Sequence, residues 1–258
     1  MPATDFGPIS LFYEDIAGAG EWPLLLIHEL GGSSASWHAA IPHLAPHHRL
    51  IVPDLRGVGR SEKPPSQFDF SSLTDDLAAL LAALGVKTCD VLGAALGAFA
   101  GASLALRHPT LVRRLILCAV AETVSPVVAD YLTSRAARVR TQGMRVAADE
   151  SLKNAFPDPH GAVRAAYRPL WLANDPAAYA ELSLALARVR MAPSDWQRIT
   201  QPTLVLSGAR DFVWPPAIGQ AVAALIPNAI FATLPQAGHF PHLQSPAELA
   251  ARARKFLG

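Results

Sequence analysis

The chain has few charged residues and no long uninterrupted apolar run. Charged side chains make up 17% of its 258 residues, and 22 Lys and Arg against 21 Asp and Glu leave a formal net charge of +1. So balanced a charge creates no field that would attract nucleic acid or an anionic membrane surface, and we expect neither as a partner. The longest apolar run, around residues 91–106, is shorter than the ~18 residues that a membrane-spanning helix needs.

Cysteine is nearly absent. Cys89 and Cys118 are the only two, and each lies in an apolar run typical of a strand. Two buried thiols fit a reducing cytoplasm better than a disulfide scaffold. The first residues, Met1 to Gly7, lack the basic and apolar segments of a secretory signal. We therefore expect a cytoplasmic protein whose cysteines pack in its core.

Apolar runs and helical patterns alternate along most of the chain, and 51% of the residues are hydrophobic. This alternation predicts one α/β domain with a mostly parallel sheet and helices on both faces. Runs that are apolar throughout are typical of strands covered on both sides. Strands are expected at residues 11–13, 24–28, 50–53, 89–92, 115–118, 203–207 and 230–234. Helices are expected at residues 35–44, 73–84, 96–107, 217–225 and 247–256.

Residues 122–199 break this alternation. They are helical in pattern, rich in Ala and Arg, and contain no convincing strand. We predict a helical cap inserted between two strands of a core made of residues 1–121 and 200–258. An insertion there lies over the carboxyl ends of the strands, where open α/β sheets bind ligands, so we expect it to act as a lid.

The segment Gly93-Ala94-Ala95-Leu96-Gly97 joins an expected strand to an expected helix. A nucleophile elbow, G-x-S-x-G, needs small flanking residues because its central residue occupies a strained turn. Gly93 and Gly97 meet that steric demand, and Ala95 stands where serine would be. Taken alone, the pattern is more typical of a pair of glycines that allow close packing of a helix on a strand.

A second loop follows another expected strand. Ile27-His28-Glu29-Leu30-Gly31-Gly32 lies where loops of the HGGG type hold an oxyanion with backbone N–H groups. The expected donors are the amides of Leu30 and of Leu96, the residue after the elbow centre. We expect His28 to order this loop through hydrogen bonds and to border the substrate pocket.

An acid and a histidine follow the last two expected strands. Asp211 comes just after residues 203–207, and His239 comes just after residues 230–234. A carboxylate bonded to Nδ1–H of the histidine would leave its Nε2 as a base. The chain order is elbow, acid, histidine, which differs from the order in chymotrypsin and in subtilisin.

With these segments the chain resembles the α/β-hydrolase family over nearly its whole length. The run Pro53-Asp-Leu-Arg-Gly-Val-Gly-Arg-Ser61 is similar to the family segment D-x-R-G-x-G-x-S. The resemblance implies a mostly parallel eight-stranded sheet with helices on both faces and a helical cap. It also implies hydrolysis of a small ester, lactone or amide-like bond without a metal or organic cofactor.

Weaker similarities point to 3-oxoadipate enol-lactonases, which hydrolyse a small anionic lactone. They lie in residues 141–144, 173–176 and 201–208. Two departures from the family pattern fall in the expected active site: Ala95 replaces serine, and Glu29 stands where glycine is usual.

Three accounts of Ala95 are open. In the first, His239 with Asp211 activates a water that attacks the substrate directly, while the Leu30 and Leu96 amides hold the oxyanion. In the second, alanine was introduced in place of a serine nucleophile, so restoring serine would raise the rate by orders of magnitude. In the third, the pocket belongs to a cofactor-free lyase or to a ligand-binding protein without catalysis.

Two further carboxylates, Glu29 and Glu122, are candidates for the site. Glu29 is either a carboxylate turned to solvent or capping the next turn, or a group at the pocket mouth that orients water or binds an amine. Glu122 is a fallback acid, and we prefer Asp211 for its G-x-x-D context.

Other residues are candidates for the pocket and its surroundings. Trp171, Trp214 and Phe240 line an apolar pocket or pack in the core. The histidines at residues 43, 47 and 48 lack the spacing and the partners of a metal site. Four arginines of residues 122–199 could attract an anionic substrate, but we predict that they lie on a solvated helix face. They are Arg135, Arg138, Arg140 and Arg145. The expected partner is a small-molecule substrate, and a homo-oligomer stays open.

Overall fold

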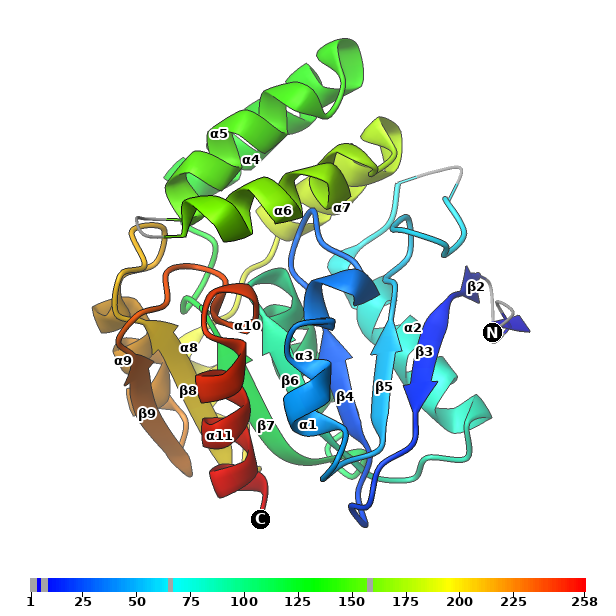
Figure 1. Cartoon of the computed structure of the whole chain (residues 1–258), viewed down its shortest axis with the longest axis vertical. Helices are drawn as coiled ribbons and strands as arrows, with labels where there is room; N and C mark the ends of the chain where they lie inside the picture. The colour runs from blue at the N-terminus through cyan, green and yellow to red at the C-terminus, as the bar shows by residue number, and fades with distance from the viewer. Residues whose placement is uncertain (1–3, 6–8, 65–66, 157–159) are drawn as a thin grey trace.

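The computed structural model of the chain describes residues 4–5, 9–64, 67–156 and 160–258 (Figure 1). The strands are β1 (Thr4–Asp5), β2 (Ser10–Leu11), β3 (Tyr13–Ile16), β4 (Leu24–Ile27), β5 (Leu50–Pro53), β6 (Cys89–Ala94), β7 (Val112–Cys118), β8 (Thr203–Gly208) and β9 (Ala229–Leu234). The helices outside residues 122–199 are the 3-10 helix η1 (Ser34–Trp37), α1 (Ile41–Leu44), α2 (Phe70–Ala83), α3 (Leu96–Arg107), α9 (Pro216–Leu225), α10 (Pro241–Gln244) and α11 (Pro246–Leu257). Residues 122–199 contain the helices α4 (Pro126–Gln142), α5 (Arg145–Ala155), α6 (Gly161–Leu172), α7 (Pro176–Ala187) and α8 (Pro193–Gln197).

The main sheet has the strand order β3-β5-β4-β6-β7-β8-β9, and only β3 runs antiparallel to its neighbour. The register aligns the carboxyl ends of the parallel strands. Ile27 lies opposite Gly93, and Ala94 lies opposite Cys118. Residues that follow these strands therefore gather at one edge of the sheet, at the arrowheads in Figure 1.

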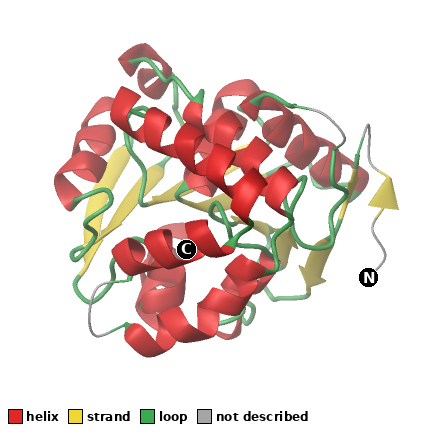
Figure 2. Ribbon diagram, turned by 90° about the horizontal axis from the view of Figure 1, so that it is seen from above, coloured by secondary structure: helices red, strands yellow, loops and turns green. Residues whose placement is uncertain are grey.

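Successive apolar residues of the central strands point to opposite faces of the sheet. In β4, Leu25 and Ile27 join the core under α2, α3 and α9, whereas Leu24 and Leu26 join the core under α1 and α11. All four side chains are completely buried. In Figure 2 the strands form a band between two groups of helices, so the predicted fold class is confirmed.

The N-terminal end of the sheet differs from the sequence prediction. One strand was expected at residues 11–13 and eight in the sheet, whereas the described residues form seven strands in the main sheet and a separate antiparallel pair, β1 and β2. The division falls at Phe12. Its N–H donates to the Ser61 hydroxyl and its carbonyl accepts from Asp54 N–H, so both backbone groups are engaged by a loop.

Residues 122–199 contribute helices α4 to α8 in the described part of the chain, and α4 to α7 lie beyond the arrowheads of the parallel strands in Figure 1. Helices α4 and α7 pack together, with the Ser183 hydroxyl donating to the carbonyl of Leu132 at 3.1 Å. No helix among the described residues combines the length and the apolar character that crossing a membrane requires. We call residues 122–199 the helical insertion.

Both cysteines pack in the core, as predicted. Cys89 and Cys118 are free thiols and completely buried. Burial raises the pKa of each thiol to about 12. Neither is therefore a reactive nucleophile near neutral pH.

Candidate active site

The elbow has a backbone conformation that most residues avoid. Ala95, between β6 and α3, has φ 50° and ψ −107°. A Cβ on Gly93 would lie 2.1 Å from the Gly97 carbonyl oxygen, and a Cβ on Gly97 would lie 2.2 Å from that of Ile27. Neither position accepts a side chain, which is the steric demand that the sequence pattern predicts. Close packing alone would not require a positive φ at Ala95.

His239 and Asp211 meet in the structure. The Nδ1 of His239 lies 2.8 Å from Oδ2 of Asp211, and the two residues are 8% and 3% exposed. The other carboxylate oxygen accepts the backbone N–H groups of Val213 and Trp214 at 2.8 and 2.9 Å. Because an ionised carboxylate only accepts hydrogen bonds, the proton lies on Nδ1 and Nε2 is left as a base.

A glutamine that the sequence analysis missed holds the His239 loop. Oε1 of Gln244 accepts the N–H groups of Gly238 and Phe240 at 3.0 and 2.9 Å. Its Nε2 donates to the Ala155 carbonyl at 3.2 Å, and the same carbonyl accepts the N–H of His239 at 3.3 Å. The loop is thus tied to helix α5 of the insertion. No motif signals this role, because a lone glutamine has no characteristic spacing.

The loop after β4 is ordered by His28. Its Nδ1 lies 2.8 Å from the Glu29 carbonyl oxygen, and its Nε2 accepts the N–H of Leu55 at 3.0 Å. A ring nitrogen that accepts a hydrogen bond carries no proton, so the donor to the Glu29 carbonyl is Nδ1–H. His28 is completely buried, and the expectation that it borders the pocket is wrong, because its two ring nitrogens are engaged by Glu29 of the same loop and by Leu55 after β5.

One cavity brings most of the predicted residues together. Its volume is about 180 Å³, and Ala95, His239, Leu30 and Leu96 all border it. The Leu30 and Leu96 amides have no hydrogen-bond acceptor among the described residues. The aromatic side chains expected there, Trp171, Trp214 and Phe240, also line the wall. A cavity of ~150 Å³ accepts benzene, so this one suits a small substrate.

Arg135 overturns part of the prediction for the arginines of the insertion. It lies on α4, is 5% exposed and borders the cavity. Its Nη1 donates to the Ser151 hydroxyl at 2.5 Å, and its Nε has no partner in the described part of the chain. The guanidinium lies 5.0 Å from the Tyr131 ring centre and 6.0 Å from that of Trp171. No carboxylate among the described residues forms an ion pair with it.

The other arginines fit the solvated face that was predicted. Arg138 and Arg140 form ion pairs with glutamates of the insertion, and Arg145 is exposed. Glu122, the fallback acid, is also exposed, and Asp211 is the carboxylate bonded to His239.

Both interpretations of Glu29 are wrong. Its side chain does not reach solvent, accepts no backbone N–H of the next turn among the described residues, and does not border the cavity. It is completely buried and turns away from the elbow into a polar cluster with Ser36, Tyr167 and His242. Burial alone would raise the pKa of Glu29, but the charge and hydrogen bond of His242, with a smaller effect of the Tyr167 hydrogen bond, lower it to about 2. The carboxylate is therefore ionised inside the protein.

The chain is similar to known proteins over most of its length. A family model described as alpha/beta hydrolase fold matches residues 23–246. The 2-hydroxymuconate semialdehyde hydrolase of Pseudomonas sp. (strain CF600) is 30% identical, over 93% of this chain and 88% of its own.

Two solved structures are similar over nearly the whole chain. A thermophilic esterase from Thermogutta terrifontis, described as malate bound, has a TM-score of 0.91 and 30% identity, covering 96% of this chain and 93% of its own. The enol-lactonase from Burkholderia xenovorans LB400 has a TM-score of 0.92 and 27% identity, covering 99% of both chains.

Proposed function

Because this chain belongs to the α/β-hydrolase family, we propose that it hydrolyses a small ester, lactone or amide-like bond with a water that His239 activates. The observation that carries the proposal is the ordered His239–Asp211 pair at the wall of the cavity that Ala95 also borders. A binding protein has no need of such a pair. The absent serine hydroxyl leaves space for a water beside the elbow.

Besides the attacking water, the proposed reaction uses only groups of this chain. Nε2 of His239 takes a proton from water as the oxygen attacks the substrate carbonyl carbon. Negative charge develops on the carbonyl oxygen, which accepts hydrogen bonds from the N–H groups of Leu30 and Leu96. When the tetrahedral intermediate collapses, the imidazolium returns the proton to the leaving oxygen or nitrogen. The products are a carboxylic acid and an alcohol, enol or amine. Asp211 keeps the ring in the required tautomer and stabilises the imidazolium.

Arg135 narrows the substrate class to molecules that carry a carboxylate. An unpaired buried cation is costly, and an anion bound beside it would offset that cost. Guanidinium groups bind carboxylates through two parallel hydrogen bonds. The Thermogutta terrifontis esterase is described with malate, a small dicarboxylate, which is compatible with this proposal.

The helical insertion completes the proposed site. In this proposal residues 122–199 form a cap on a core of residues 1–121 and 200–258, and Arg135 and Trp171 of the cap meet His239 of the core around the cavity. Such a cap excludes bulk water from the substrate. The rival function is a lyase in which His239 moves a proton without hydrolysis.

Replacing His239 tests the mechanism. We expect His239→Ala to lower kcat by about 10²–10⁴, the usual contribution of a general base, in assays with monoesters of small dicarboxylic acids. The products are identified by mass spectrometry in ¹⁸O-labelled water, since hydrolysis incorporates the label and a lyase reaction does not. Ala95→Ser is the companion variant. A rate increase of about 10³ or more in that variant would contradict direct attack by water.

Replacing Arg135 tests the substrate class. We expect Arg135→Met to raise KM for monomethyl succinate at least about tenfold and to leave hydrolysis of the uncharged dimethyl ester unchanged. Arg138→Met is the matched control, because Arg138 lies on the same helix and pairs with Glu150 at the surface. Equal effects of the two variants on both esters would remove Arg135 from the binding site.

A further inference from the structure

We propose that Glu29 is a positioning residue through which the helical insertion sets the geometry of the oxyanion loop and of the His239 loop. The proposal rests on the proposed function for the roles of Leu30 and His239. Glu29 itself does not border the cavity, so it acts only through its neighbours.

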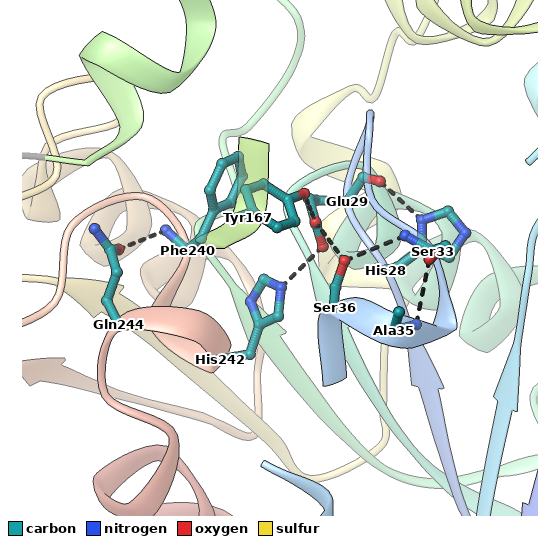
Figure 3. A network of polar contacts seen from close by, with 9 residues as sticks. All are labelled: His28, Glu29, Ser33, Ala35, Ser36, Tyr167, Phe240, His242 and Gln244. Carbon is teal, nitrogen blue, oxygen red and sulfur yellow. Dashed lines mark hydrogen bonds and ion pairs between the residues drawn. The ribbon is translucent and has the colours of Figure 1, made fainter. Parts of the chain in front are cut away.

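Every side-chain partner of Glu29 comes from a different part of the chain (Figure 3). Oε1 accepts the Ser36 hydroxyl at 2.8 Å, from η1 just after the loop. The same oxygen accepts the hydroxyl of Tyr167, from α6 of the insertion. Oε2 lies 2.9 Å from Nε2 of His242, from α10. One carboxylate thus joins three elements that are distant in sequence.

The contacts continue from these partners to the proposed catalytic groups. His242 follows His239 by three residues, so the histidine that binds Glu29 and the proposed base share one short segment. Phe240, between them, has its ring centre 5.9 Å from that of Tyr167 and 5.0 Å from that of His239. On the other side, Glu29 is adjacent to Leu30, the proposed oxyanion donor.

Helix α6 and the residues after it also contact the loop backbone. The Trp171 ring covers Gly31 so closely that a Cβ there would lie 2.3 Å from its Cε2. Asn174 Nδ2 donates to the Gly31 carbonyl at 2.9 Å. Gly32 must also lack a side chain, because its Cβ would lie 2.0 Å from Oε1 of Glu29. The insertion therefore contacts the loop at Glu29 and at Gly31, the two residues that flank Leu30.

A buried carboxylate makes this arrangement cooperative. Glu29 is stabilised only when all its donors are in place, and loss of one donor leaves charge unsatisfied in a dry interior. When α6 moves away from the core, Tyr167 no longer donates to Glu29. Seating of the insertion and alignment of the two loops are thus one event rather than two.

The test removes one hydroxyl and follows both loops. Tyr167→Phe keeps the ring packing, and we expect it to speed amide hydrogen exchange about tenfold in residues 28–37 and 236–244, the effect of losing one charge-assisted hydrogen bond. Tyr179→Phe is the matched control. Tyr179 is also a buried tyrosine of the insertion, and its hydroxyl has no partner among the described residues. Faster exchange confined to α6, or equal changes in both variants, would overturn the proposal.

Kinetics separate positioning from simple stability. For the monoester assay we expect Tyr167→Phe to lower kcat about tenfold with KM within twofold, because binding at Arg135 is untouched. The double variant Glu29→Gln with Tyr167→Phe should lose less than the product of the single effects, because both remove one contact. Independent effects would overturn the proposal. Hydrogen exchange needs no substrate, so it reports on the coupling even if the proposed reaction fails.

Discussion

At the scale of single residues, the site depends on groups that are missing as much as on groups that are present. Gly93 and Gly97 lack the Cβ atoms that would collide with backbone, and Ala95 lacks the hydroxyl of a serine elbow. The turn persists around Ala95 although its positive φ costs free energy, of order 1–3 kcal/mol for such a conformation.

The steric argument for the elbow predicts a large difference between two glycines. Gly97→Ala would place its Cβ 2.2 Å from the Ile27 carbonyl oxygen, whereas a Cβ on Gly161 meets no atom of the described residues within 4 Å beyond its chain neighbours and its own helix backbone. We expect Gly97→Ala to lower the free energy of unfolding by at least about 3 kcal/mol. Gly161→Ala, in helix α6, should change it by less than about 1 kcal/mol, towards greater stability. Urea unfolding followed by circular dichroism measures both, and similar values would contradict the argument.

At the scale of elements, the site is a set of loops that the sheet brings to one edge and that side chains then fix. The register of β4, β6 and β8 determines where each loop begins. It does not determine how each loop is held. That depends on buried polar side chains such as Gln244 and Glu29, each of which binds three partners.

Gln244 gives the prediction at this scale. Gln244→Leu leaves the N–H groups of Gly238 and Phe240 without their acceptor in a buried loop. Each of the two unsatisfied groups costs ~1–3 kcal/mol, so we expect a loss of about 2–6 kcal/mol in the free energy of unfolding and a lower kcat. The control is Gln220→Leu on the exposed side of α9, which should be within ~0.5 kcal/mol of the parent. Thermal unfolding distinguishes the two, and an unchanged Gln244→Leu protein would refute the loop's dependence on this side chain.

The sequence predicted the residues whose place depends on the strand that they follow. It did not predict contacts between residues that are distant in the sequence. The elbow, Asp211 and His239 could be placed because each follows a recognisable strand, and parallel strands end at a common edge. Glu29 was misjudged because its partners Tyr167 and His242 lie 138 and 213 residues away. Arg135 was assigned to a solvated face because the sequence does not reveal that α4 turns this residue into the cavity. Packing between helices decided both cases.

At the scale of the whole molecule, an ionised carboxylate buried between elements makes stability depend on pH. The pKa of Glu29 falls from an ordinary 4.5 to about 2 in the folded protein, although burial acts in the opposite direction. Between these pH values the unfolded chain binds a proton at Glu29 that the folded chain does not. Stability from this group is therefore present above pH 4.5 and is lost as the pH falls towards 2.

The corresponding prediction compares the parent protein with Glu29→Gln. The difference between their free energies of unfolding should shrink by about 3 kcal/mol from pH 5 to pH 2, because one pKa unit corresponds to ~1.4 kcal/mol. Asp76 and Asp90, whose pKa values burial raises, titrate in both proteins and cancel in the comparison. Urea unfolding across this pH range measures the difference. A difference independent of pH would show that Glu29 is not a depressed acid.

The close contact between Trp171 and Gly31 limits which helical insertions a related protein could donate to this chain in a chimera. The insertion is continuous in sequence and looks like a module that recombination could replace at residues 122 and 199. Its inner surface, however, fits one particular loop: Gly31 has no room for a side chain under the indole, and Tyr167 requires an acceptor at Glu29. A chimera that receives another insertion should regain a well-formed pocket only when residues 28–32 are exchanged with it.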